Sequence, residues 1–438
     1  MAFDKPGTVA IATQGCKVNR YDSQVILEGL LERGWHQLKF GEAADLVIIN
    51  SCTVTSGSDR DLRKLVRQAR RGSPDAHIMV TGCKAEVDPE GTLDLAEVDE
   101  ILGNPLKDRL PEMIESDSEP IEIHPLDNRV EDRGITRLDW RARPILKIQD
   151  GCNLRCSFCI VPSARGDSRS RSANETVKQA KILEQAGHHE LVLSGIQLGF
   201  YRDPEGQASK LEDLLKLLLD ETQVVRYRLG SMLPRHMRPA LIDLFVEAKD
   251  RLCPHFHISL QSGDDGILKA MKRPYRSGHF KELVQELWTR LDKPCLGTDV
   301  IAGFSGEDET AYANTMALIE ELPLAYGHVF PFSLRPGTPA EALGDDIQPE
   351  LKKARVAELR ALFEVKQQVY RREQLGRRLS VLVETHHSKD WLRGTTENYQ
   401  QVLLPEKLGA IGDLIPLEIS GLEDGILCHH PQTKRAFT

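Results

Sequence analysis

Residues 145–159 read ILKIQDGCNLRCSFC, and this stretch decides the organisation of the chain. Its first part, Ile145 to Gln149, is an apolar run short enough for a buried strand. Cys152, Cys156 and Cys159 follow directly, in Cys-x3-Cys-x2-Cys spacing. In a barrel of alternating strands and helices, functional groups gather at the carboxyl ends of the strands. The stretch therefore predicts a strand followed by a functional loop.

The same alternation continues from Trp140 to about Leu362. The expected strands are Ile145 to Gln149, Leu191 to Ser194, Val225 to Leu229, Phe256 to Leu260, Gly297 to Ala302 and His328 to Phe332. Helix-like segments separate them, among them Glu175 to Ala186, Leu211 to Leu219 and Glu307 to Glu321, and a long charged helix from Leu351 to Leu375 ends at Gly376. Six such units predict a central partial (βα)6 barrel.

The first part of the chain predicts a second, smaller α/β domain. Apolar runs rich in β-branched residues occur at Thr8 to Ala12, Leu46 to Asn50 and Ile78 to Thr81. A helix capped by Ser23 and ended by Gly34 is expected between the first two, and one from Arg60 to Arg71 between the last two. Strands alternating with helices predict a parallel sheet.

The last part of the chain changes to short strand candidates separated by Gly, Pro and polar turns. They are Leu379 to Glu384, Gln400 to Leu404, Leu414 to Glu418 and Gly425 to His429. This pattern predicts a small all-β barrel of the OB type. An acidic stretch from Glu112 to Asp132 is interpreted as a solvated linker. We therefore divide the chain at residues 1–115, 116–137, 138–370 and 371–438.

The composition excludes several classes of protein. With 438 residues, 40% hydrophobic and 28% charged, the chain has the make-up of a globular protein of several domains. No apolar run approaches the roughly 20 residues of a membrane helix, and the N-terminus lacks a signal-peptide pattern, so we expect a cytoplasmic protein without a membrane partner. The formal charge of -9 gives no general attraction to nucleic acid. Any RNA binding must come from local basic patches.

Three thiolates in one short loop can bind three irons of a 4Fe-4S cube and leave the fourth iron open to another ligand. Zinc is the alternative, but structural zinc takes four ligands, and no partner pair follows the loop. Nine cysteines, an odd number without an export signal, indicate reduced thiols rather than disulfides.

Cys16, Cys52 and Cys83 form a second constellation. Each lies within a few residues of the end of one expected strand of the first domain. The carboxyl ends of parallel strands share one edge of a sheet, so these thiols are expected to converge on a second cluster. Cys253, Cys295 and Cys428 are scattered, and we interpret them as structural.

The Cys-x3-Cys-x2-Cys spacing, with Phe158 before the last cysteine, resembles the radical S-adenosylmethionine (SAM) superfamily. The resemblance implies that SAM chelates the open iron and that one electron cleaves it to a 5′-deoxyadenosyl radical, with Phe158 against the adenine side. It further implies that Gly195, Ser231, Gln261, Asp299 and Gly303, near the ends of barrel strands, lie around SAM.

The whole chain, with two thiol triplets and a C-terminal β barrel, resembles the methylthiotransferases. Gly15-Cys16-Lys17-Val18-Asn19, Cys52-Thr53-Val54-Thr55 and Lys147-Ile148-Gln149-Asp150-Gly151-Cys152-Asn153 are similar to the branch that modifies N6-threonylcarbamoyladenosine in tRNA. The resemblance implies two 4Fe-4S clusters, two SAM molecules, methylthiolation at C2 of the adenine next to the anticodon, and a TRAM domain that binds RNA. It also implies an electron donor of the flavodoxin or ferredoxin type.

Two sets of basic residues are candidates for RNA contact. Arg60, Arg63, Lys64, Arg67, Arg70 and Arg71 share one face of an expected helix, which we interpret as a face without acidic partners. Arg165, Arg169 and Arg171 follow the cluster loop. They resemble the family's Arg-Gly and Arg-Ser signature, which implies that they line the substrate mouth. Trp391 and Tyr399 are stacking candidates in the C-terminal barrel. The fourteen histidines show no ligand spacing, so we interpret them as structural or surface residues.

Two kinds of alternative remain open. Within the enzyme class, the substrate is isopentenyladenosine or a ribosomal-protein aspartate instead. Outside it, the chain is a non-catalytic iron-sulfur protein that binds RNA. The sequence does not reveal the sulfur donor, the tRNAs used, or the oligomeric state.

Overall fold

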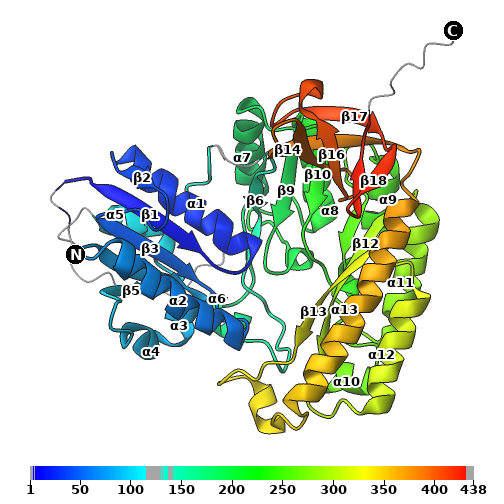
Figure 1. The fold of residues 1–438 in the computed structure, drawn as a ribbon, viewed down its shortest axis with the longest axis horizontal. Coiled ribbons are helices and arrows are strands. Elements are labelled where there is room, and N and C mark those ends of the chain that lie inside the picture. Colours follow the sequence, from blue (N-terminus) through cyan, green and yellow to red (C-terminus); the bar gives the residue numbers. More distant parts are fainter. Residues whose placement is uncertain (1–2, 4, 115–129, 131, 137–141, 431–438) are drawn as a thin grey trace.

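The computed structural model describes residues 3, 5–114, 130, 132–136 and 142–430. Figure 1 shows an N-terminal α/β part, a central barrel of strands and helices, and a C-terminal sheet that lies on the barrel. In the described residues, no helix is both long enough and apolar enough to cross a membrane. The expected α/β class, with its parallel N-terminal sheet, partial barrel and C-terminal sheet domain, is confirmed.

The N-terminal sheet is parallel and has the strand order β2-β1-β3-β4-β5. Its strands are β1 (Thr8–Thr13), β2 (His36–Leu38), β3 (Leu46–Ser51), β4 (His77–Gly82) and β5 (Glu100–Leu102). The helices of this part are α1 (Lys17–Glu32), α2 (Ser56–Gly72), α3 (Cys83–Val87), α4 (Pro89–Leu93) and α5 (Leu110–Met113).

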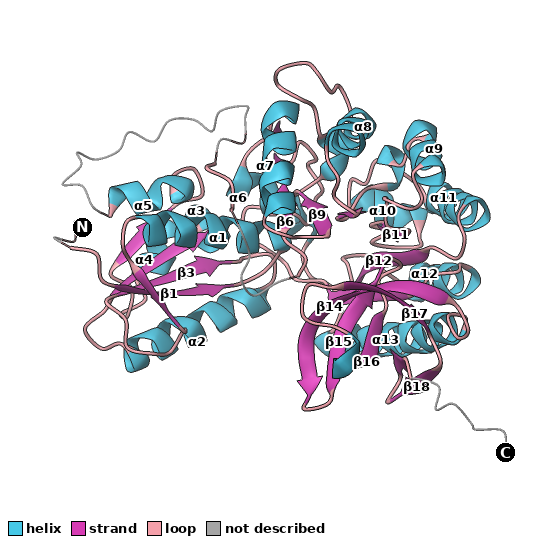
Figure 2. Ribbon diagram, turned by 90° about the horizontal axis from the view of Figure 1, so that it is seen from above, coloured by secondary structure: helices cyan, strands magenta, loops and turns pink. Residues whose placement is uncertain are grey.

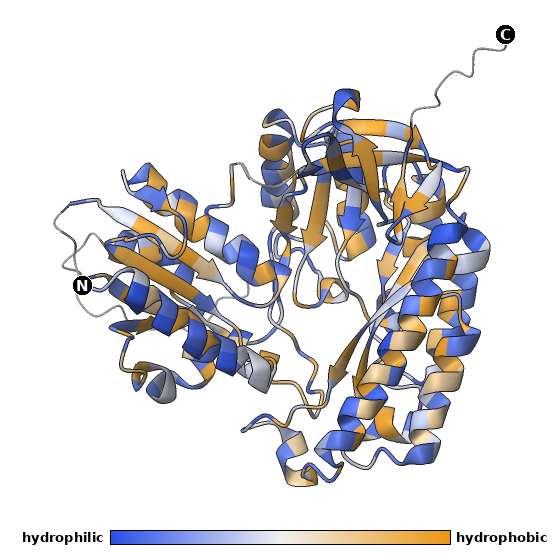
Figure 3. Cartoon of the chain, in the orientation of Figure 1, coloured by the Kyte–Doolittle hydropathy of each residue, from blue (hydrophilic) through white to orange (hydrophobic). Residues whose placement is uncertain are grey.

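Both faces of this sheet are covered, by α1 and α5 on one side and α2 on the other (Figure 2). Leu62 and Val66 of α2 belong to one core, and Ile26 and Leu30 of α1 to the other. Strand β3 is buried along its whole length, as expected for a central parallel strand. Figure 3 shows β1 and β3 mainly hydrophobic and α2, beside them, mainly hydrophilic.

The predicted start of the first helix is wrong. Helix α1 begins at Lys17 with Cys16 as its N-cap, about two turns before Ser23. Ser23 is buried instead, where its hydroxyl accepts hydrogen bonds from Thr13 and from Asn50 Nδ2. Gly34, at φ +87, follows the C-cap residue as predicted.

The central barrel is open and contains six strands in two three-stranded parallel sheets, β10-β9-β6 and β11-β12-β13. Single bridges, such as Met232 to Ile258, join the two sheets. The strands are β6 (Ile145–Lys147), β9 (Glu190–Ser194), β10 (Arg226–Leu229), β11 (His255–His257), β12 (Cys295–Ala302) and β13 (Tyr326–Pro331), with a small pair, β7 (Gln149–Asp150) and β8 (Arg169–Ser170), beside them.

The barrel helices lie outside the strands and close over one continuous core. They are α6 (Val161–Arg165), α7 (Ala173–Gln185), α8 (Leu211–Glu221), α9 (Pro239–Glu247), α10 (Asp265–Ala270), α11 (Ser277–Arg290), α12 (Glu309–Glu321) and α13 (Pro349–Arg372). Helix α13 ends three residues before the predicted Leu375.

The C-terminal sheet has the order β17-β14-β15-β16-β19-β18. Its strands are β14 (Arg378–Ser388), β15 (Trp391–Thr396), β16 (Gln401–Pro405), β17 (Leu414–Glu418), β18 (Gly421–Glu423) and β19 (Ile426–Cys428). The sheet is attached to β10 by two buried arginines: Arg226 and Arg228 both bind Glu190 and donate to backbone carbonyls of the C-terminal sheet and its turn.

A buried charge network joins the N-terminal part to the barrel. Asp22 of α1 accepts hydrogen bonds from Lys107, from Lys147 of β6 at 2.6 Å and from Arg165 of α6 at 3.1 Å. Arg165 also pairs with Asp150 at 2.9 Å. We call Asp22, Lys107, Lys147, Asp150 and Arg165 the junction network.

The interpretation of residues 112–132 as solvated throughout is wrong at its end. Asp132 is buried, and it accepts hydrogen bonds from Tyr21 and Arg171 and pairs with Lys147. Val130 and Ile135 are buried too. Most of the expected linker, residues 115–129 and 131, lies outside the described residues. The described end of this segment docks against the junction because its carboxylate meets buried cations.

Candidate functional site

Cys152, Cys156 and Cys159, which we call the barrel triad, occupy a tight loop between β7 and α6. The Cys152 amide donates to the Gly166 carbonyl at 3.0 Å, and the Cys159 amide to the Cys156 carbonyl at 3.1 Å. Gly151 has φ +68, and a Cβ there would lie 1.9 Å from the Asp167 carbonyl oxygen, so only glycine fits. The backbone therefore folds the loop so that its three thiols gather at one end of the barrel.

Burial dominates the protonation of the barrel triad. It raises the pKa of Cys159 to about 12 and also raises that of Cys152. Opposing this, the half-buried Arg273 donates from Nη1 to Cys156 Sγ at 3.2 Å. Arg273 Nη2 has no hydrogen-bond partner among the described residues. Arg273 is a site residue that the sequence analysis missed, since it stands more than a hundred residues from the thiol it contacts.

Cys16, Cys52 and Cys83, which we call the N-terminal triad, come from three adjacent strands. Cys16 caps α1 after β1, Cys52 follows β3, and Cys83 opens α3 after β4. Gly15 has φ +83, and a Cβ there would lie 2.8 Å from Cys52 Sγ. Cys52 and Cys83 are buried and Cys16 is exposed. Burial raises the pKa of Cys52, with smaller effects from nearby Cys83 and Cys16.

The two triads are linked through α3 and α6. Asn104 Nδ2 donates to the carbonyl of Ala164 on α6 at 2.5 Å and contacts Cys83 Sγ at 3.8 Å. Arg165, also on α6, donates to Asn19, three residues after Cys16. Both contacts therefore join α6, the helix that follows Cys159, to residues around the N-terminal triad.

A pocket of about 260 Å³ opens where the two triads approach each other. Val54 and Thr55, which follow Cys52, line one part, and Phe158 and Cys159 line another. Gln261, Asp299, Ile301, Phe330, Pro331, Phe332 and Ser333 are among the residues of the barrel wall. Three of the residues expected around SAM, Phe158, Gln261 and Asp299, thus border this pocket.

The other three expected SAM residues do not line the pocket. Gly195 lies against Gln149, whose Oε1 would be 2.7 Å from a Cβ at this position. Ser231 is exposed beyond β10. Gly303 has φ +74 and faces Lys352, so its glycine is required by the turn and by that close approach.

The donor sets fit iron-sulfur cubes better than single ions. All six cysteines of the two triads are free thiols. In the part of the chain that the structure describes, two groups of His, Cys, Asp or Glu bring three ligand atoms within 4.8 Å of one another, and neither contains a cysteine of the triads. Ligands of one zinc ion must converge on that ion, whereas the thiolates of a cube bind different irons and stand farther apart.

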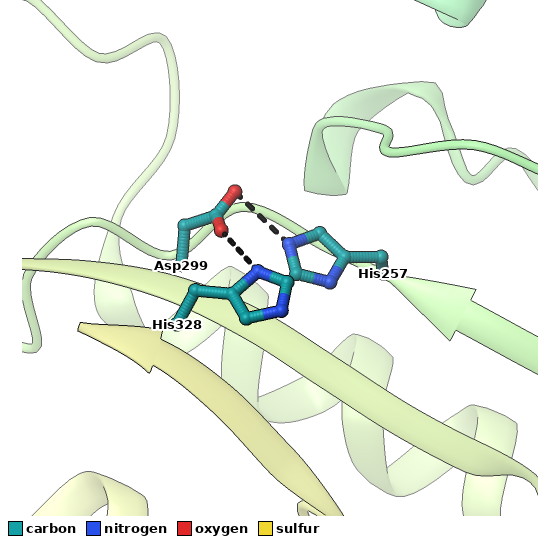
Figure 4. A group of neighbouring side chains, drawn as sticks. All are labelled: His257, Asp299 and His328. Carbon is teal, nitrogen blue, oxygen red and sulfur yellow. Dashed lines mark hydrogen bonds and ion pairs between the residues drawn. The ribbon is translucent and has the colours of Figure 1, made fainter. Parts of the chain in front are cut away.

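One of those two groups is His257, Asp299 and His328, on β11, β12 and β13 (Figure 4). Asp299 Oδ2 lies 2.9 Å from His257 Nε2, and Asp299 Oδ1 lies 3.2 Å from His328 Nδ1. Burial has the largest single effect and raises the pKa of the Asp299 carboxyl. His257 and His328 together outweigh it and hold the pKa far below its usual range.

His257 is buried and His328 is exposed, in keeping with their interpretation as structural or surface residues, and the structure adds that both bind Asp299. Asp299 and His328 are direct partners in the β12–β13 register. The alternation of His255 and His257 along one strand was the signal in the sequence, but the register that adds Asp299 and His328 was not readable from it.

Several cations lie near Lys17, the residue after Cys16. Lys17 reaches the surface, but protein atoms surround most of its side chain. This crowding, with Arg143, Arg228 and Arg20 nearby, lowers its pKa to about 8. Glu190 acts in the opposite direction. Arg143 and Arg228 are paired with Glu384 and Glu190, so Lys17 and Arg20, on the first turn of α1, are the cations that follow Cys16 most closely.

The structure separates the RNA candidates. On α2, Arg60, Arg63, Lys64, Arg67 and Arg71 are exposed, but the face is not free of acids, because Lys64 pairs with Asp61 at 3.0 Å and Arg67 with Glu97 at 3.8 Å. Arg70 is held by Asp99 at 2.6 Å and by three backbone carbonyls. The basic residues are clustered on α2 as predicted, but three of the six, Lys64, Arg67 and Arg70, are paired with acidic residues.

Arg165 and Arg171 do not lie at a substrate mouth. Both are buried, Arg165 against Asp150 and Asp22 and Arg171 against Asp132. Arg169 pairs with Asp150 at 3.2 Å. A sequence pattern alone does not reveal this, because the carboxylates come from other parts of the chain.

The two aromatic candidates of the C-terminal sheet have different surroundings. Tyr399 stacks on His255 of the barrel at 4.1 Å, with the guanidinium of Arg228 5.3 Å from its ring centre. Trp391 is half-buried and meets His430 edge-on. Tyr399 therefore belongs to the contact between barrel and C-terminal sheet.

Comparisons with known proteins agree with this architecture. A family model described as the radical SAM superfamily matches residues 146–319, and one described as uncharacterized protein family UPF0004 matches residues 8–103. The threonylcarbamoyladenosine tRNA methylthiotransferase MtaB of Aquifex aeolicus is 36% identical, covering 89% of this chain and 95% of its own. MtaB of Bacillus subtilis is 34% identical, covering 94% and 93%.

A tRNA-2-methylthio-N(6)-dimethylallyladenosine synthase of Methylobacillus flagellatus is 32% identical, covering 95% of this chain and 97% of its own. Among solved structures, the radical SAM methyltransferase TsrM of Kitasatospora setae has a similar fold, with a TM-score of 0.57 at 15% identity over 76% of this chain and 77% of that one. The superfamily uses SAM and 4Fe-4S clusters, which fits the thiol triads described above. Long matches at more than 30% identity establish the family: this chain belongs to the radical SAM tRNA methylthiotransferases.

Proposed function

We propose that this enzyme inserts a methylthio group at C2 of N6-threonylcarbamoyladenosine, next to the anticodon of tRNA. One observation carries the proposal: Val54 and Thr55, which follow Cys52 closely, line the same pocket as Cys159 of the barrel triad. An aromatic C–H bond is too strong and too weakly acidic for polar chemistry. A pocket shared by two thiol triads allows a radical source and a sulfur source to act on one base.

In this proposal the barrel triad and the N-terminal triad each hold one 4Fe-4S cluster. When bound, the clusters and SAM supply a carbon radical and a sulfur that carries a methyl group. The chain's own residues hold and enclose these groups. Arg273 offsets negative charge at Cys156, and Phe158 packs edge-on to Phe304, which in turn packs on Phe332, so that one wall of the pocket is dry.

Gln261 contributes a fixed backbone to the same wall. Its φ of +73 is unusual for a residue with a side chain. Two backbone hydrogen bonds to β12 hold it there, from its amide to the Asp299 carbonyl and from the Ile301 amide to its own carbonyl. Such strain at a pocket supports a role in binding SAM.

The cations near Cys16 support the threonylcarbamoyl substrate. The threonyl group carries a carboxylate, and Lys17 and Arg20, which follow Cys16 on α1, suit an anion. An isopentenyl group has no charge and would gain nothing from them. Five relatives at 32–36% identity bear the threonylcarbamoyladenosine name.

The dimethylallyladenosine reaction is the second candidate, because relatives at 30% and 32% identity bear that name. The two substrates differ at N6 and not at C2. Only the identity of the modified nucleoside separates them.

The remaining assignments follow from this reaction. We infer residues 1–115 as the domain of the N-terminal triad, 138–370 as the radical SAM core, and 371–438 as the RNA-binding TRAM domain, joined by 116–137. Acting on tRNA places the enzyme in the cytoplasm. A flavodoxin or ferredoxin type of protein is the proposed electron donor.

Mass spectrometry of tRNA nucleosides tests the proposal. Cells that lack the protein should accumulate N6-threonylcarbamoyladenosine, and returning it should restore the 2-methylthio form. Reconstituted enzyme with SAM and a strong reductant should make the same conversion without oxygen. Restoration of methylthio-isopentenyladenosine instead would favour the second candidate, and RNA binding without 5′-deoxyadenosine would show a non-catalytic protein.

A further inference from the structure

We propose that His328 and Phe330 of β13 form a platform on which the target adenine, turned out of the anticodon loop, stacks at the mouth of the pocket between the two triads. The inference rests on the proposed function, because it assumes an RNA substrate. It goes beyond that function by naming the residues that hold the base.

Six rings follow one another along the inner wall of the barrel. In order they are Tyr399, His255, Tyr326, His257, His328 and Phe330, and we call them the ring series. Consecutive ring centres lie 4.1 to 6.4 Å apart. Glycine at position 297 makes room for the series, since a Cβ there would lie 2.1 Å from the Tyr326 ring. Aromatic rings at these separations attract one another.

The series is buried at one end and open at the other. At the buried end, Tyr399 from the C-terminal part stacks on His255, which is buried. At the open end, the His328 side chain is 58% exposed and Phe330 is 42% exposed. A large apolar ring exposed beside a pocket costs solvation energy, and a ligand that covers it removes that cost.

The open end borders the pocket of the two triads. Phe330 lines it, as does Asp299, the hydrogen-bond partner of His328. Beyond β13, Ser333 accepts a hydrogen bond from the Ser56 amide, and Arg335 binds Asp59 at 2.7 Å. These contacts place the end of β13 beside the loop that follows Cys52. A base stacked on Phe330 would therefore stand between the two triads.

Hydrogen bonds fix the orientation of the rings. Asp299 accepts from both His257 and His328, as Figure 4 shows. The Tyr326 hydroxyl lies 3.1 Å from His257 Nδ1 and 2.7 Å from His255 Nε2. His328 is thus held through Nδ1, and in the described residues its Nε2 has no hydrogen-bond partner. That nitrogen is free for the polar edge of a purine or its N6 substituent.

Nucleic-acid chemistry favours a base as the occupant. An enzyme that acts on a ring carbon must first take the base out of its stack, and single-stranded loops give up their bases most readily. Extruded bases are held by stacking on aromatic side chains, histidine included. His257, Asp299 and His328 also have the spacing of metal ligands. Both carboxylate oxygens of Asp299, however, already accept hydrogen bonds from the two imidazoles.

The test uses the reconstituted enzyme and a tRNA anticodon stem-loop with fluorescent 2-aminopurine at the target position. Phe330→Ala and His328→Ala should each weaken binding about 5- to 100-fold, as expected for loss of one stacked base. In their complexes 2-aminopurine should be brighter, because no aromatic ring quenches it. Phe330→Tyr and His328→Phe keep a ring and should retain most of the affinity and the quenching.

Val365→Ala is the matched control. Val365 is 62% exposed on α13 and does not line the pocket, so affinity and fluorescence should stay as in the wild type. 5′-Deoxyadenosine formed without RNA should be equal in Val365→Ala and the wild type, which shows that SAM binding and the barrel cluster are intact in the control.

Equal affinity and equal fluorescence in wild type and the two alanine variants would overturn the platform. So would one zinc per chain that disappears in both His328 variants, since the cluster would then be a metal site. Failure of the proposed function looks different: the wild type itself would form 5′-deoxyadenosine but leave every tRNA nucleoside unchanged.

Discussion

The two thiol triads are built in opposite ways. The barrel triad lies in one loop, where local backbone hydrogen bonds and Gly151 set its shape. The N-terminal triad is assembled from the ends of β1, β3 and β4, and exists only when the sheet is formed. The first can keep its thiols together through local geometry. The second depends on tertiary structure.

The difference extends to their surroundings. Two of the barrel thiols are buried, and Arg273 contacts the triad directly. In the N-terminal triad Cys16 is exposed and is followed by Lys17. The position of this triad relative to the barrel depends on the junction network and on Asn104. We therefore expect chemistry to fail at different steps when each region is perturbed.

The largest effect is expected from removing the triads themselves. Replacing Cys152, Cys156 and Cys159 by Ala should abolish SAM cleavage. Replacing Cys16, Cys52 and Cys83 should leave 5′-deoxyadenosine formation but end sulfur insertion. Each variant should hold about half the iron of the wild type, measured on protein purified without oxygen. Equal loss of SAM cleavage in both variants would contradict this division of labour.

Arg165→Met should break the link between the two regions. It leaves the carboxylates of Asp22 and Asp150 with fewer buried cations, which costs about 3–5 kcal/mol of the free energy of unfolding. Urea denaturation measures the change. Arg155→Ala is the control, since its pair with Asp167 is exposed and contributes less than about 1 kcal/mol. A similar small loss in both variants would show that the junction network does not hold the regions together.

Asp108→Asn should reveal a pH dependence at the junction. Burial raises the pKa of Asp108 to about 6, while Lys147 opposes the shift and Asp22 and Asp132 add to it. A raised folded pKa means that protonated Asp108 stabilises the fold below about pH 4 and that this stability is lost as pH rises through 6. The neutral variant escapes that loss.

The stability of Asp108→Asn relative to the wild type should therefore increase by about 1–3 kcal/mol between pH 4 and pH 7.5. Thermal or urea unfolding at several pH values measures the difference. Surface Asp61→Asn, on α2, is the control and should show little pH dependence. A flat difference for Asp108→Asn would mean that this carboxyl is ionised in the fold at all these pH values.

The smallest effect concerns α2, next to the N-terminal triad. Arg63 and Arg67 are exposed, and each that contacts phosphate should contribute about 0.7 to 0.9 to the slope of log K against log salt. The double alanine variant should lower that slope without changing SAM cleavage. Arg290→Ala, on the outer face of the barrel, serves as the comparison. An unchanged slope for Arg63 and Arg67 would show a merely solvated helix.

Much of the fold was predictable, because strand and helix periods are local. The three expected N-terminal strands and the six barrel strands all appear, shifted by a few residues at their ends. Ser23 was predicted to be the N-cap because a small polar residue before an apolar run is a typical helix start. The true cap, Cys16, carries no such mark.

The candidate site divides in the same way. Spacing and strand ends indicated all six cysteines of the triads, and Phe158, Gln261 and Asp299 do border the pocket. Arg165 and Arg171 were expected at the substrate mouth because they resemble the family's Arg-Gly and Arg-Ser signature, but both are buried. Their buried carboxylate partners, Asp22 and Asp132, come from regions that no local pattern connects.

By itself the sequence determined the order of strands and helices and the two sets of thiols, since hydrophobic period and short spacing act within a few residues. Only the tertiary structure decided which charges are buried together and which rings meet. Strand register fixes these meetings: Asp299 faces His328 because β12 and β13 pair in that alignment. If the pairing of β13 with β12 shifted by one residue, every side chain of β13 would turn to the other face and the ring series would be lost.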